Sequence, residues 1–254
     1  MTPALTLLLG VAIAAPAAAQ VTPADVAVPF YTPPAFMQGV HRHWFAPRAA
    51  EFASEAQRLT PAIAAVCTAS APTALDDARA RWKSAALAFD KLAAVAVGPL
   101  LLRRSVRQID FTPTRPELIE RAIRAQPADA GAMERVGTPA KGLPALEWLL
   151  WTRPVAANTP ACRYAVLVAA EVDTEAQALA RAFGELAAKD WAGDDEASVA
   201  GMGEVLNQWI GGIERLRWAQ IEKPQRSTNG KPPAFPRTAS GATQESWAAQ
   251  WQGL

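Results

Sequence analysis

Histidine and cysteine are both scarce in this sequence, with two residues of each type among 254. His41 and His43 lie two positions apart, so on a helix their side chains point about 200° apart and cannot chelate one ion together. The HExxH, CxxC and GxSxG motifs are absent, as are the glycine-rich phosphate-binding loops. These absences exclude the common zinc, thiol-redox, serine hydrolase and nucleotide sites that a sequence can reveal.

No charge of one sign dominates, because 25 basic residues stand against 24 acidic ones. This balance excludes a basic nucleic-acid surface and an acidic tail, and a hydrophobic content of 50% excludes a disordered chain. Aromatic residues make up only 7%, whereas alanine runs through every long segment and favours helix. No run alternates as a half-buried strand does. The sequence predicts an all-α fold of packed helical bundles.

The N-terminus lacks a basic residue but has an apolar run, Leu5–Ala14, followed by Ala17–Ala19. This pattern predicts a signal peptide over residues 1–20 and a periplasmic protein. A membrane anchor is the alternative, but a span needs about 20 apolar residues, and no later segment provides one. Residues 21–34, with four prolines, are expected to form an extended leader.

Helical spacing and end signals predict most of the remaining elements. The expected helices cover residues 35–66 (bent or divided at its prolines), 72–97, 116–124, 142–151, 160–189, 195–223 and 243–252, with a loop at 224–241. The residues expected in the core are Trp82, Phe89, Leu146, Leu149, Leu150, Phe183, Leu186, Leu206 and Ile213.

The two cysteines, Cys67 and Cys162, allow a single pairing. An exported protein can form this disulfide, and the alternative is two buried thiols.

Glu147 is the most informative acidic residue, because it lies in the apolar stretch LPALEWLLW. A carboxylate in such surroundings must be paired with a cation, bind a ligand or have a raised pKa. Pairing with a nearby arginine is the simpler interpretation, and a ligand site is the other. Arg115, in the loop FTPTRPE, could reach a buried carboxylate or an anionic ligand, or could simply be solvated.

The stretch Gly142–Trp151 resembles the GxHxxE segment of the imelysin family, which is followed by an apolar helix. Weaker similarities are found at His43 with Pro47, at Trp82, in the Phe111–Arg115 loop, at both cysteines and in the segment Arg237–Thr243. Pro144 stands where the motif has histidine. The chain also ends soon after the Arg237–Thr243 segment, so an incomplete C-terminal bundle is expected, and the sequence is either a short branch of the family or a fragment.

The resemblance implies an exported bacterial protein of two helical bundles, here residues 35–140 and 141–254 of a single imelysin-like domain. The family was first described as zinc metallopeptidases, and many members are linked to iron uptake. Because proline offers no metal ligand, the resemblance implies no catalytic residue here, and enzyme activity is doubtful.

Three functions are therefore weighed. The leading one is a non-catalytic protein of bacterial iron uptake that binds a metal ion or a small iron-bearing ligand and works with a membrane iron-uptake protein. Gly142, Glu147 and Arg115 would bind the ligand, and His43 and Glu147 would hold iron, which accepts carboxylate oxygen. The alternatives are a zinc metallopeptidase with altered ligands and a periplasmic scaffold or adaptor. Nucleic acid is not an expected partner.

Overall fold

Helices make up all the regular secondary structure in the part of the chain that the structure describes. This structure, a computed structural model, describes residues 31–68, 72–226, 230 and 232–254. The predicted signal peptide and residues 21–30 of the predicted leader lie outside the described residues. The all-α prediction is confirmed.

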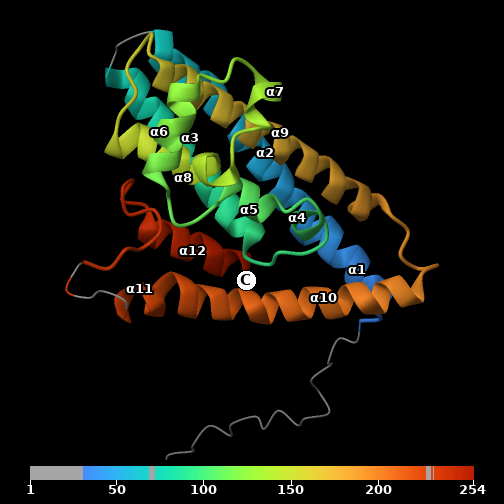
Figure 1. The fold of residues 1–254 in the computed structure, drawn as a ribbon. Helices are drawn as coiled ribbons and strands as arrows, with labels where there is room; N and C mark the ends of the chain where they lie inside the picture. Colours follow the sequence, from blue (N-terminus) through green and yellow to red (C-terminus); the bar gives the residue numbers. More distant parts are fainter. Residues whose placement is uncertain (1–30, 69–71, 227–229, 231) are drawn as a thin grey trace, which may run out of the picture. The chain divides into compact units, whose positions relative to one another are not determined.

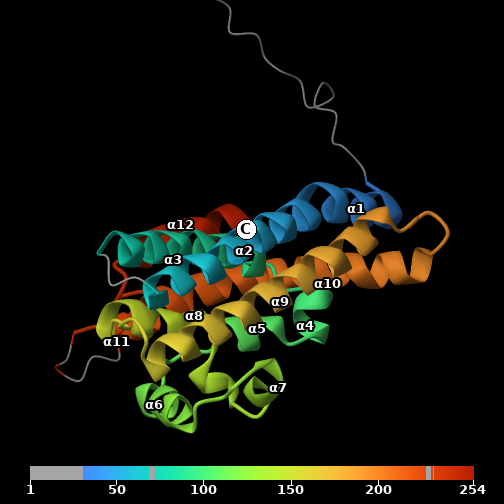
Figure 2. The same ribbon diagram turned by 90° about the horizontal axis from the view of Figure 1, so that it is seen from above.

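Three long helices form the centre of the fold (Figures 1 and 2). Helix α2 (Ala46–Thr68) lies between α3 (Pro72–Ala93) and α9 (Pro160–Ala188) and packs on both. Phe52 of α2 contacts Phe89 of α3, with ring centroids 5.1 Å apart. Burial of such aromatic side chains from facing helices provides the main hydrophobic stabilisation.

Further helices cover this centre. Helix α12 (Thr243–Gly253) packs on α3, and α1 (Pro33–Val40) packs on α10 (Asp195–Glu214). Gly212 of α10 allows close approach, because a Cβ atom there would lie 2.3 Å from the carbonyl oxygen of Ala94. Helix α12 packs on α3 itself, and α10 approaches the residue that follows α3.

The connection from α3 to α9 consists of short helices, and in Figure 2 α6 (Pro116–Ala125) and α7 (Ala130–Met133) lie on the far side of α9 from α3. The connecting elements are α4 (Pro99–Leu102), α5 (Ser105–Ile109), α6, α7, the 3₁₀ turn η3 (Thr138–Ala140), α8 (Gly142–Glu147) and the π-helical turn η4 (Trp148–Thr152). Helix α8 packs on α9.

Two long helical segments continue through π-helical turns. The turn η2 (His41–Phe45) joins α1 to α2, and η5 (Arg215–Glu222) joins α10 to α11 (Lys223–Arg226). Pro61 lies inside α2 without ending it. The predicted helix over 35–66 is thus two helices in sequence, divided at η2 just before Pro47, whereas Pro61 does not interrupt α2.

The predicted core is largely confirmed. Trp82, Phe89, Leu146, Leu149, Leu150 and Phe183 are buried. Leu186 and Ile213 are half-buried, and the prediction for Leu206 is wrong, because its side chain is 41% exposed. Helix α10 turns Val205 and Gly212 inward instead.

The predicted disulfide between Cys67 and Cys162 is confirmed, with the two Cα atoms 5.5 Å apart. It joins the end of α2 to the beginning of α9. Thr32–Leu254 form one compact unit, within which the boundary between bundles at residue 140 stays a prediction. None of the described helices is long and apolar enough to cross a membrane.

Candidate functional site

Arg237 is the centre of a buried polar network. Its guanidinium makes two ion pairs: Nη2 is 3.1 Å from Oδ1 of Asp90, and Nη1 is 2.8 Å from Oδ1 of Asp110. The guanidinium also lies 5.4 Å from the ring centroid of Trp82. Burial lowers the pKa of Arg237, but Asp110 and Asp90 outweigh it and raise that pKa overall. Arg237 is therefore a permanent buried cation.

The partners of Arg237 come from distant parts of the chain. Asp90 lies near the end of α3, Asp110 directly follows α5, and Arg237 precedes α12. Ser246 of α12 donates a hydrogen bond of 2.7 Å from Oγ to Oδ2 of Asp90. The network therefore ties the C-terminal helix to two earlier elements.

Glu147, the last residue of α8, extends this network. It is buried, and its Oε1 accepts hydrogen bonds from the backbone N–H of Ser240 at 2.9 Å and from the Ser240 hydroxyl at 2.7 Å. Trp82 of α3 holds α8 in place, because its indole N–H donates to the carbonyl oxygen of Leu143 at 2.9 Å. The direct partner of Glu147 is therefore a serine, and the positive charge of Arg237 acts on it from nearby.

The structure does not bring the two predicted metal ligands together. Glu147 lies in α8 and is hydrogen-bonded to Ser240, whereas His43 lies in η2, which packs on α1, α2 and α9. His43 is also exposed, whereas Glu147 is buried.

The residues at the motif do not fit a zinc ion. Pro144 is buried in α8 and has no donor atom, and among the described residues no group of three or more histidine, cysteine, aspartate and glutamate side chains could hold a metal. Asp90 and Asp110 are already paired with Arg237, which would repel a second cation.

Arg115 lies apart from the network. It is exposed at the start of α6, and no ion pair or hydrogen bond of the described residues joins its side chain to Glu147. The arginine that reaches the buried carboxylates is Arg237, which the reasoning from sequence missed. The resemblance of Arg237–Thr243 to a family segment was the one signal that pointed to it.

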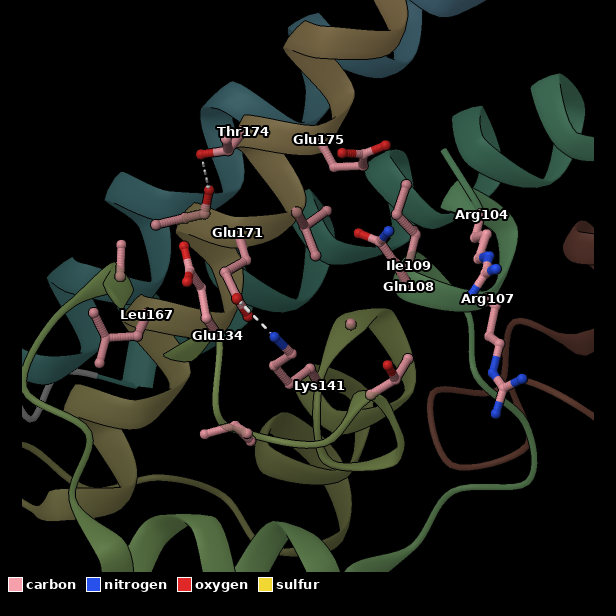
Figure 3. Close-up of a pocket in the computed structure, with 16 residues that line it drawn as sticks. Arg104, Arg107, Gln108, Ile109, Glu134, Lys141, Leu167, Glu171, Thr174 and Glu175 are labelled. Carbon is pink, nitrogen blue, oxygen red and sulfur yellow. Dashed lines mark hydrogen bonds and ion pairs between the residues drawn. The ribbon is translucent and has the colours of Figure 1, made fainter. Parts of the chain in front are cut away.

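A cavity of about 650 Å³ begins beside Gly142, the first residue of α8 (Figure 3). Gly142 has φ +75°, and a Cβ atom there would lie 2.3 Å from the carbonyl oxygen of Ile109. Only glycine permits both this backbone conformation and this approach of α8 to α5. Of the predicted ligand-binding residues, Gly142 alone lines this cavity, together with side chains of α5, α7, α9 and the loop before α8.

Comparison with known proteins identifies the class. The imelysin family model matches residues 45–254, and the chain belongs to this family. A solved imelysin-like protein from Psychrobacter arcticum 273-4 has a TM-score of 0.71 and 20% identity, covering 90% of this chain and 74% of that chain.

A second solved structure is a "putative iron-regulated protein A precursor" from Parabacteroides distasonis ATCC 8503. It has a TM-score of 0.65 and 15% identity, covering 90% of this chain and 71% of that chain. At these identities both structures establish the fold alone. A search of the curated proteins found no match.

Proposed function

We propose that this chain is an exported, non-catalytic imelysin-family protein that binds an iron-bearing ligand in bacterial iron uptake. The observation that carries the proposal is that the carboxylate of Glu147 is already hydrogen-bonded to another residue of the protein. Ser240 occupies its Oε1 with two hydrogen bonds, and Pro144 supplies no neighbouring ligand. At this position the chain has a clamp for its C-terminal segment instead of a metal centre.

The geometry favours an iron-bearing molecule over a bare ion. The buried carboxylates around Arg237 already have a cation, whereas the cavity beside Gly142 has the volume typical of small-molecule sites. Charged side chains of both signs line this cavity. The name of one structural neighbour, the iron-regulated protein A precursor, gives the link to iron further support.

Export is supported by two independent features. Residues 1–20 have the pattern of a signal peptide, and Cys67 and Cys162 form a disulfide, which persists in oxidising compartments such as the periplasm. A periplasmic iron carrier would deliver its ligand to a membrane iron-uptake protein.

The test is binding of ferric nitrilotriacetate to the full chain by equilibrium dialysis, with zinc titration and digestion of unfolded casein in parallel. We expect about one iron per chain and no digestion. Glu147→Gln should keep iron binding and lose about 1 kcal/mol of stability, because a charged hydrogen-bond acceptor becomes neutral. Glu117→Gln, at an exposed position on α6, is the matched control. Casein digestion that a chelator and Glu147→Gln both abolish would overturn the proposal.

A further inference from the structure

The cavity beside Gly142 has charges of opposite sign at its two ends. Figure 3 shows Arg104 and Arg107 on one side and Glu134 and Glu171 on the other. Both arginines are exposed, and no ion pair of the described residues includes either of them. Arg107 lies 5.5 Å from the ring centroid of Phe111, and a ligand could use both guanidinium groups without breaking an ion pair.

Two of the three acidic side chains in the cavity, Glu171 and Glu175, are already paired with a basic side chain. Lys141 Nζ lies 2.8 Å from Oε1 of Glu171, and Arg103 Nη2 lies 2.7 Å from Oε2 of Glu175. The charges that remain are the carboxylate of Glu134 at one end and the guanidinium groups of Arg104 and Arg107 at the other.

One carboxylate oxygen at the acidic end lacks a hydrogen-bond partner among the described residues. This atom, Oε2 of Glu171, is buried. Burial raises the pKa of Glu171 while Lys141 opposes the change, and the nearby charge of Glu134 raises it further. A cationic donor placed against Glu134 and Glu171 would reduce the repulsion between the two carboxylates. It would also give Oε2 of Glu171 a hydrogen-bond partner.

The basic end has a strained backbone. Arg104, between α4 and α5, has φ 57° and ψ 29°, the left-handed conformation that glycine or asparagine adopts at lower cost. Strain of this kind at a non-glycine residue is typical of ligand-binding positions. Arg104 lines the cavity, so the residue with the strained backbone belongs to the proposed site.

We infer that this cavity binds a small zwitterion with at least two carboxylates and one ammonium group. The carboxylates pair with Arg104 and Arg107, and the ammonium group donates to Glu134 and to Oε2 of Glu171. Guanidinium groups bind carboxylates strongly in such pairs, and about 650 Å³ accommodates a molecule of tripeptide size. The inference rests on the proposed function for the ligand's iron, because carboxylates are also good iron ligands.

The test uses an iron-free probe, the tripeptide glycyl-glycyl-glutamate, and the same peptide with its amine acetylated. Calorimetric titration of the full chain should show binding of the free peptide and about tenfold weaker binding of the acetylated one. Arg104→Asn, which suits the left-handed backbone, and Arg107→Gln should each weaken both peptides about tenfold. Glu134→Gln should weaken the free peptide alone. Arg124→Gln, an exposed change on α6, is the control.

The outcomes separate this inference from the proposed function. Absence of peptide binding at millimolar concentration, or equal affinity for both peptides, would overturn the zwitterion assignment, even if iron binding persisted. Peptide binding with the expected variant effects, in a protein that retains no iron, would support the site and overturn the proposed function. Thermal unfolding of each variant checks that a lost affinity is not a lost fold.

Discussion

Arg237 combines a left-handed backbone, with φ 60°, and a guanidinium buried between two carboxylates. A non-glycine residue in this conformation costs roughly 1–2 kcal/mol. The ion pairs with Asp90 and Asp110 and the position over Trp82 offset that cost, and they could not form if the side chain pointed elsewhere. The residue is thus held in place by the network it completes.

Removing this cation should be severely destabilising. We expect Arg237→Met to lower the free energy of unfolding by about 3–5 kcal/mol, because Asp90 is left buried without its partner. Urea unfolding measures the difference. Arg226→Met removes an exposed arginine that pairs with Glu222, and as a control it should change stability by less than about 0.5 kcal/mol. Similar losses in the two variants would refute the role given to Arg237.

His41 is the second residue with a specific energetic role. It is buried and stacks on Trp191, with ring centroids 5.3 Å apart, and its Nδ1 has no hydrogen-bond partner among the described residues. Burial, with a smaller effect of Lys189, lowers its pKa from 6.5 to about 4. The imidazole is therefore neutral in the folded protein at neutral pH.

This lowered pKa makes stability depend on pH. Between pH 6.5 and about 4 the unfolded chain binds a proton at His41 that the folded chain does not, so stability falls as the pH falls through this range. The loss from this residue should reach about 3 kcal/mol. His41→Phe keeps an aromatic ring beside Trp191, and its stability should not show the part of this pH-dependent loss that His41 causes. Urea unfolding at pH 7 and pH 4 measures it, and an equal pH dependence in both proteins would contradict the assignment.

At the residue scale, the sequence indicated which charged residue is buried but not which residue is its partner. Glu147 lies among apolar residues, so its burial and its need for a partner were predictable. Its partner Ser240 is 93 positions away in a segment whose composition indicates only a loop. Arg237 and Asp90 are 147 positions apart, and no local pattern links them.

At the scale of elements, the long helices were predictable because apolar spacing, prolines and capping residues indicate the same helix positions. Thr159 caps α9 as its sequence indicates, by accepting from the N–H of Cys162. Helices α4 and α5, with four and five residues, are too short to show a period. Helix α10 is apolar on more than one face, so spacing could not tell Val205 from the exposed Leu206 and Trp209.

The disulfide is the covalent link between two central helices, α2 and α9. Its cysteines are separated by 95 positions, so the bond constrains a large part of the unfolded chain. Cys67→Ala with Cys162→Ala should therefore lower the free energy of unfolding by about 2–4 kcal/mol.

Urea unfolding of the wild type and the double variant tests this estimate. Thiol titration of the unfolded, unreduced wild-type protein should find no free thiol. Two free thiols per chain would show that the bond does not form.

At the scale of the whole molecule, the fold followed from the sequence but the cavity proposed as a ligand site did not. Helix-favouring composition and the Gly142–Trp151 segment led to the family, which the family model confirms, and two solved structures confirm the fold. The cavity draws its lining from α5, α7, α8, α9 and the loop before α8, and Gly142 was the only part of it that the sequence singled out. A concave site built from separate elements appears only once they pack.

The most direct test of the central claim is the metal content of the full chain isolated from the periplasm of an iron-replete bacterial host. Elemental analysis should find about one iron per chain and little zinc, with iron lost when Arg104 and Arg107 are replaced and retained in Glu147→Gln. Stoichiometric zinc that depends on Glu147, together with proteolysis of casein, would contradict this account and would support the function of a metallopeptidase.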